Sequence, residues 1–129
     1  MNDTKKLRDL SFSLSDVHKS LLQYQKVITE IREESAMNPN QLLQNTISHI
    51  DFEWLRKISK LMTRLDESID EGGDEAPDLQ LQILKELHLL FNDVNHDPEF
   101  RARIDHALNK DPNLCLQIIN FRKRLSDHR

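Results

Sequence analysis

The stretch LRDLSFSLSDVHKSLLQYQKVITEI, residues 7–31, decides the fold, because its apolar residues recur at alternating spacings of three and four. Such a row lies along one side of a single α-helix that packs lengthwise against other helices. The unbroken phase predicts a helix over residues 4–35, although Ser13 or Ser15 can instead begin a helix and leave residues 1–12 frayed. The row comprises Leu7, Leu10, Leu14, Val17, Leu21, Tyr24, Ile28 and Ile31.

The rest of the chain carries start and stop signals for several shorter helices. Asn38, Asp97 and Asp111 each precede a proline, and an Asn or Asp cap followed by proline in the first turn is typical of a helix start. Asp51 indicates either another cap or a bend. The run GGDEAP at residues 72–77 predicts a loop, because paired glycines, acids and a proline end helices.

Each shorter segment has an apolar face at helical spacing. The expected inward residues are Leu42, Leu43, Ile47, Ile50, Phe52, Leu55, Ile58, Met62, Leu65, Ile69, Leu79, Ile83, Leu84, Leu87, Phe91, Val94, Phe100, Ile104, Leu108, Leu114, Ile118, Phe121 and Leu125. Trp54 and Leu61 widen the stripe on their helix. We therefore predict an all-α fold, an antiparallel bundle of five to six helices. We expect a single domain, 1–129, with a long N-terminal helix over 1–35 and a bundle body over 38–129.

Composition narrows the class of protein and its compartment. The chain has 129 residues and only two glycines, which argues against a sheet protein and against a glycine-rich phosphate loop. The single cysteine, Cys115, excludes an internal disulfide framework and fits a reducing compartment. No apolar segment follows Met1, and no run approaches the ~20 residues that span a bilayer. These features predict a cytoplasmic protein that does not associate with membranes.

The charge balance disfavours nucleic-acid binding. The net charge is −4, and residues 66–78 hold seven carboxylates and no basic residue. A helix-turn-helix interpretation still arises from two short helices over residues 98–109 and 112–126. The second of these helices would present Asn113, Gln117, Asn120 and Lys123 outward.

Residues 88–106 contain several side chains of the types that bind metal ions. The candidate ligands there are His88, Asp93, His96, Asp97 and His106. No Glu-x-x-His or His-Glu-x-x-His spacing occurs, and Asp97 has a better explanation as a helix cap.

Cys115 near a helix start could be an activated thiolate, but a lone cysteine beside an apolar face more often packs as a small hydrophobe. We therefore assign no metal, cofactor or catalytic residue.

The stretch FEWLRKIS, residues 52–59, contains a candidate partner surface. Trp and Arg are over-represented in binding hot spots, but a Trp beside a Leu, as at Trp54 and Leu55, more often packs in the core. The stretches 49–70 and 111–125 resemble a group of small uncharacterised bacterial proteins. The residues that carry the resemblance are Phe52, Trp54, Leu55, Arg56, Ser59, Asp66, Glu67, Asp111 and Pro112. It covers about the last two-thirds of the chain and implies a bacterial helical protein without an assigned reaction. It gives weight to Trp54, Arg56 and Ser59 as a small surface patch.

The length of the N-terminal helix predicts a homodimer. A helix over residues 4–35 is about 48 Å long at about 1.5 Å per residue, and no later helix approaches that length. Part of the apolar row should then be exposed, and such a stripe normally finds another chain, most commonly by twofold pairing. The predicted dimer seam consists of Leu7, Leu10, Leu14, Val17 and Leu21.

Three functions remain open at this point. The sequence favours a non-enzymatic protein-interaction or adaptor module that acts through helix faces. The alternative is a ligand binder or enzyme with a pocket between helices, using a combination of His88, Trp54 and Arg56. A helix-turn-helix DNA-binding regulator is the third choice.

Overall fold

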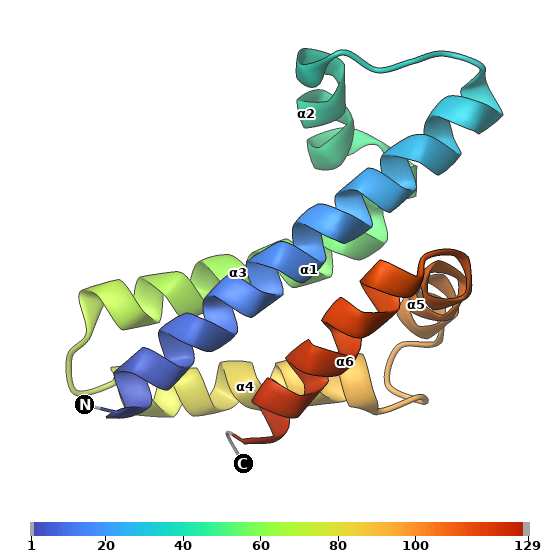
Figure 1. Ribbon diagram of the computed structural model, residues 1–129. Coiled ribbons are helices and arrows are strands. Elements are labelled where there is room, and N and C mark those ends of the chain that lie inside the picture. Colours follow the sequence, from blue (N-terminus) through green and yellow to red (C-terminus); the bar gives the residue numbers. More distant parts are fainter. Residues whose placement is uncertain (1, 128–129) are drawn as a thin grey trace.

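Residues 2–127 are described by a computed structural model, and within this range the chain forms six α-helices, one short 3-10 helix and no strand. The elements are α1 (Asn2–Glu33), α2 (Pro39–Ser48), η1 (Ile50–Phe52), α3 (Glu53–Glu71), α4 (Ala76–Asn92), α5 (Pro98–Lys110) and α6 (Pro112–Ser126). α1 runs towards the end of the molecule where α2 lies, and α3 and α6 run back (Figure 1). The predicted all-α bundle is confirmed.

The helix α1 is continuous from Asn2 to Glu33, so no break occurs at Ser13. The frayed alternative for residues 1–12 is therefore wrong for residues 2–12, and Met1 lies outside the described residues. None of the helices between residues 2 and 127 combines the length and the apolar character that a membrane-spanning helix needs.

The apolar row of α1 forms part of the chain's own core, which corrects its assignment as a dimer seam. The five seam residues are all buried, and α1 packs mainly against α3 and α6 of the same chain. These residues are Leu7, Leu10, Leu14, Val17 and Leu21. Each neighbour is shorter than α1, but α3 and α6 flank it together and cover the row up to Leu21. Beyond that point the row turns outward, and its last member, Ile31, is 72% exposed.

A cluster of aromatic rings fills the centre of the bundle. The Phe91 ring of α4 lies 5.4 Å from the Phe100 ring of α5 and 4.8 Å from the Phe121 ring of α6, centroid to centroid. The Trp54 indole of α3 lies 5.7 Å from Phe100. All these contacts are edge-on, the arrangement that aromatic quadrupoles favour, so the cluster ties four helices together.

Three of the predicted helix starts are confirmed by hydrogen bonds. Asn38 accepts from the Gln41 N–H in a capping box, Asp97 accepts from Phe100, and Asp111 accepts from Asn113 and Leu114. At the end of α3, Gly72 and Gly73 have φ of 63° and 93°, where other residues are strained, and they end the helix as predicted.

Of the two alternatives for Asp51, the bend is confirmed, because the residue lies in η1 between α2 and α3. The cap is wrong: the side chain of His49 caps η1, while the Asp51 carboxylate is buried against α1. Leu79 and Val94, expected to face inward from one helix, are exposed. Leu79 lies in the first turn of α4 and Val94 lies beyond its end at Asn92, where the helical phase no longer applies.

We expect the Phe91→Ala variant to lose about 3–5 kcal/mol of unfolding free energy, because removal of this ring leaves a cavity between α4, α5 and α6. The exposed Phe12 on α1 provides a matched control. Phe12→Ala should change the free energy of unfolding by no more than about 0.5 kcal/mol. Urea unfolding followed by circular dichroism measures both, and equal losses would contradict the described core.

Candidate functional site

Trp54, Arg56 and Ser59 do not form the surface patch expected from the sequence. Trp54 is in the core, because α3 is enclosed by α1 on one side and by α5 on another. Its indole Nε1 donates to Gln25 Oε1 at 3.0 Å. Ser59 is half-buried, and its hydroxyl donates to the Arg56 carbonyl at 3.1 Å. The three side chains make contacts within the chain, and of the three only Arg56 contacts the exposed helix α2.

Buried polar side chains link α1 to the turn that precedes α3. Gln25 Nε2 donates to Thr29 Oγ1 at 3.2 Å, and Thr29 Oγ1 donates to Asp51 Oδ2 at 2.8 Å. The guanidinium of Arg32 lies 2.6 Å from the same Asp51 oxygen. Together with the indole bond described above, these contacts form what we call the Asp51 network. Its members are Gln25, Thr29, Arg32, Asp51 and Trp54.

The environment of Asp51 favours its ionised form. Burial alone would raise the pKa of this carboxyl, but the hydrogen bonds from Arg32 and Thr29 outweigh that effect and hold the pKa below its ordinary value of 3.8. At neutral pH the network therefore contains a buried carboxylate with its counter-charge in place. Sequence reasoning missed the network. The sequence does indicate that Gln25 and Thr29 are buried, because they follow Leu21 at four-residue spacings along one side of the helix.

The end of α2 is held by Arg56 of α3. The Arg56 Nε donates to the Thr46 carbonyl at 3.1 Å, and Nη2 donates to the His49 carbonyl at 2.8 Å. Carbonyls at a helix C-terminus lack helical partners and carry partial negative charge, so a guanidinium satisfies both needs. His49 adds a second tie: its Nε2 lies 3.0 Å from Glu33 Oε1, and its Nδ1 accepts the Asp51 N–H at 3.0 Å.

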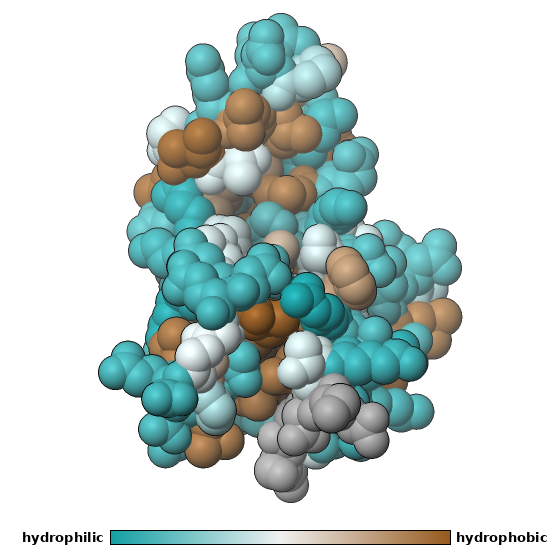
Figure 2. Space-filling model, turned by 90° about the vertical axis from the view of Figure 1, so that its left-hand side faces the viewer, coloured by the Kyte–Doolittle hydropathy of each residue, from teal (hydrophilic) through white to brown (hydrophobic). Residues whose placement is uncertain are grey.

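The outer side of α2 is apolar and exposed, which corrects the expectation that Leu43, Ile47 and Ile50 face inward. Leu43 and Ile47 are one helical turn apart and are 61% and 67% exposed, and Ile50 at the start of η1 is 74% exposed. α2 has no buried residue, and residues 36–48 contain no Asp, Glu, Lys, Arg or His. Figure 2 shows hydrophobic side chains gathered in the upper part of the molecule, where α2 lies in Figure 1. We call Leu43, Ile47 and Ile50 the α2 surface.

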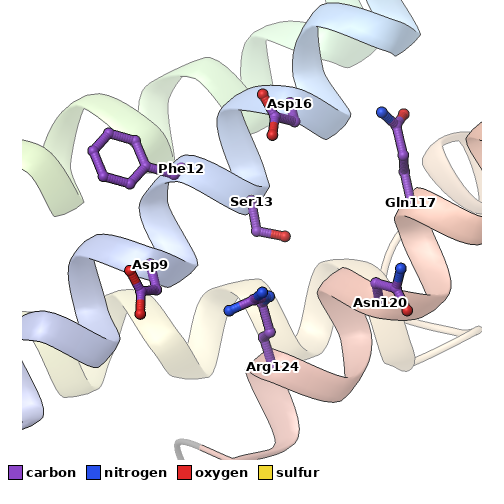
Figure 3. A pocket seen from close by; sticks show the side chains of 7 residues that line it. All are labelled: Asp9, Phe12, Ser13, Asp16, Gln117, Asn120 and Arg124. Carbon is purple, nitrogen blue, oxygen red and sulfur yellow. The ribbon is translucent and has the colours of Figure 1, made fainter.

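A cleft of about 410 Å³ lies between α1 and α6 (Figure 3). The Arg124 side chain reaches from α6 towards α1, and Ser13 points into the cleft from the opposite wall. The lining residues are Asp9, Phe12, Ser13, Asp16, Gln117, Asn120 and Arg124. The walls are polar and carry both signs of charge.

This cleft bears on the helix-turn-helix interpretation. Two of the expected outward readers, Gln117 and Asn120, line it beside the carboxylates of Asp9 and Asp16. A recognition helix placed on DNA through this side would bring those carboxylates towards phosphates, which is electrostatically unfavourable. The geometry therefore adds no support to DNA binding.

Several of the five candidate metal ligands make other contacts. Asp97 caps α5 and forms an ion pair with Lys57 of α3, and His106 hydrogen-bonds the Tyr24 hydroxyl. His88 Nδ1 lies 3.2 Å from the amide nitrogen of Asn92. Between residues 2 and 127, no three His, Cys, Asp or Glu side chains are grouped as a metal ion would require. Cys115 is a free, half-buried thiol.

No known protein family, curated protein or solved structure shows significant similarity to the chain. The resemblance of residues 49–70 and 111–125 to small bacterial proteins therefore stays a prediction. The candidate functional features among residues 2–127 are the α2 surface, the Asp51 network at the turn between α2 and α3, and the α1–α6 cleft.

We expect Asp51→Asn to lower the unfolding free energy at pH 7 by about 1–3 kcal/mol, because Arg32 loses its counter-charge. Since the folded-state pKa of Asp51 lies below its unfolded value, the wild type keeps this contribution above the ordinary value of 3.8 and loses it as the pH falls further. The gap between wild type and variant should therefore narrow in acid. Urea unfolding between pH 7 and pH 3 measures it.

The exposed Asp16 on α1 provides the control for this pH series. Asp16→Asn should change stability little at any pH in the range. A gap for Asp51→Asn that does not depend on pH would contradict the role of the ionised carboxylate.

Proposed function

We propose that the chain is a non-enzymatic protein-interaction module that binds its partner through the α2 surface. The observation that carries the proposal is the exposure of Leu43, Ile47 and Ile50 on an element that polar contacts hold in place. Exposed apolar side chains on a fixed scaffold are typical of interaction sites. A fixed position also reduces the entropy that binding must remove.

We further propose that the partner is a second copy of the chain, which makes the protein a homodimer. Two copies each carry a net charge of −4 and repel one another in most orientations, whereas residues 36–48 carry no charge. Twofold pairing brings the same patch from both copies together. Exposed Gln44 suits this arrangement, because its side-chain amide both donates and accepts and can pair with the same residue of the second copy. This interface replaces the seam from Leu7 to Leu21.

The proposed setting is the bacterial cytoplasm. It rests on the single cysteine, which a reducing compartment leaves as a thiol, and on the resemblance carried by residues 52–59.

A second candidate function is the binding of a small polar ligand in the α1–α6 cleft. The observation in its favour is that Arg124 faces the acidic wall of Asp9 and Asp16 across a cleft of about 410 Å³. This arrangement suits a ligand with both a carboxylate and an amine, such as an amino acid or short peptide. Such a ligand should raise the melting temperature of the wild type and not of Arg124→Ala. An interaction module without this site shows no ligand-dependent shift.

We expect wild-type protein to sediment as a dimer and Ile47→Asp to weaken self-association at least about thirtyfold, since loss of one hot-spot side chain costs about 2 kcal/mol or more. Leu81→Asp is the matched control, because Leu81 on α4 is 63% exposed and lies outside the α2 surface. Analytical ultracentrifugation over a range of concentrations measures all three proteins.

The result expected is a dimeric Leu81→Asp and a largely monomeric Ile47→Asp. A wild type that stays monomeric throughout refutes the homodimer. Equal weakening by both substitutions would show that the α2 surface is not the interface.

A further inference from the structure

We propose that Arg56 and Asp51 are positioning residues that control the α2 surface. In this proposal α2 is not part of the bundle core, and polar contacts at its C-terminal end hold it against α1 and α3. We call this set of contacts the latch. This inference rests on the proposed function, because it concerns the regulation of the surface assigned there. The existence of the latch does not depend on that function, because it is argued only from the contacts of α2 and of the turn that follows it.

α2 is attached to the body by few apolar contacts. None of its residues is buried, and Leu42 is its only apolar side chain packed against the core. On its N-terminal side, residues 34–38 connect it to α1, and Glu34 there has a φ of 54°, a strained value for a residue with a side chain. The Met37 N–H donates to Glu30 at 2.7 Å, and the Asn45 amide contacts the Met37 sulfur at 3.3 Å. An element with so little buried apolar surface opens more easily than the whole protein unfolds.

The C-terminal attachment is polar and runs through Arg56. Its two hydrogen bonds reach the carbonyls of Thr46 and His49, one inside the last turn of α2 and one just beyond it. Hydrogen bonds to a charged donor are stronger than neutral ones. Arg56 itself is fixed, because it follows Trp54, which the core and Gln25 hold in place. One side chain of the body thus holds the end of the helix.

Asp51 fixes the angle at which α2 leaves the bundle. It lies in η1, the turn between α2 and α3, and its carboxylate is bound to Arg32 and Thr29 of α1. His49, beside it, contacts Glu33 of α1. These contacts attach η1 to α1, while Arg56 attaches the end of α2 to α3. Loss of either set should release α2, while the aromatic cluster of α3, α4, α5 and α6 stays packed.

Hydrogen–deuterium exchange of the full chain tests the latch. In Arg56→Gln, the backbone amides of residues 40–50 should exchange at least about tenfold faster than in wild type. The amides of α4 and α6 should be unchanged. Arg56→Lys should recover part of the protection, because an ammonium keeps the charge but cannot bond both carbonyls in the fork geometry of a guanidinium. Asp51→Asn should affect the same segment.

Arg64→Gln is the matched control. Arg64 also lies on α3, and its guanidinium bonds Glu86 of α4 at 2.7 Å, away from α2. This variant should leave exchange in residues 40–50 unchanged. In the ultracentrifuge, self-association should weaken in Arg56→Gln and not in Arg64→Gln.

The outcomes separate the latch from the proposed function. Unchanged exchange of α2 in both Arg56→Gln and Asp51→Asn overturns the latch, even if the wild type is a dimer. Faster exchange spread over α3–α6 also overturns it, because Arg56 would then support the whole fold. A monomeric wild type overturns the homodimer, while the exchange rates still decide whether α2 is latched.

Discussion

The packing of one long helix, α1, between α3 and α6 is the constraint on which the rest of the structure depends. A heptad row does not keep step with a straight α-helix, and it drifts around the helix by about 20° per heptad. Along α1 this drift carries the row from buried Leu7 to exposed Ile31. The same rotation turns Gln25 and Thr29 inward, where they are fully enclosed. Buried polar groups need partners, so the second half of α1 requires a polar counterpart, and Asp51 supplies it.

The molecule is therefore held together in two different ways along its length. Around Phe91 the contacts are aromatic and aliphatic, and they depend on shape and area more than on direction. Around Asp51 the contacts are hydrogen bonds, which specify distance and angle. The hydrogen-bonded end around Asp51 is also where α2 presents its apolar side chains. A surface that must meet a partner in one orientation benefits from hydrogen-bonded support, because a rotation of α2 would break these bonds.

The parts of the fold that depend on local chemistry could be predicted from the sequence. Asn38, Asp97 and Asp111 cap helices through their own neighbours, and the stripe of α3 follows from helical spacing. The parts that depend on which helices meet could not. The dimer seam was inferred by comparing the length of each helix with that of α1, whereas α3 and α6 cover the row jointly. Helical spacing placed Trp54 on the inward side of α3, whereas the resemblance placed it in a surface patch, and no local feature shows that α3 is enclosed by both α1 and α5.

The contact between α1 and α6 joins segments at opposite ends of the described chain, and this has a consequence for how the protein is made. During synthesis α1 emerges first and α6 emerges last of the six helices. α3 can cover one flank of the α1 row early, but the other flank stays uncovered until residues 112–126 have left the ribosome. Closing such a distant contact is slow compared with local helix pairing. A nascent chain that stalls before α6 exposes an apolar strip of α1, the kind of surface that chaperones bind and that aggregates when it is left open.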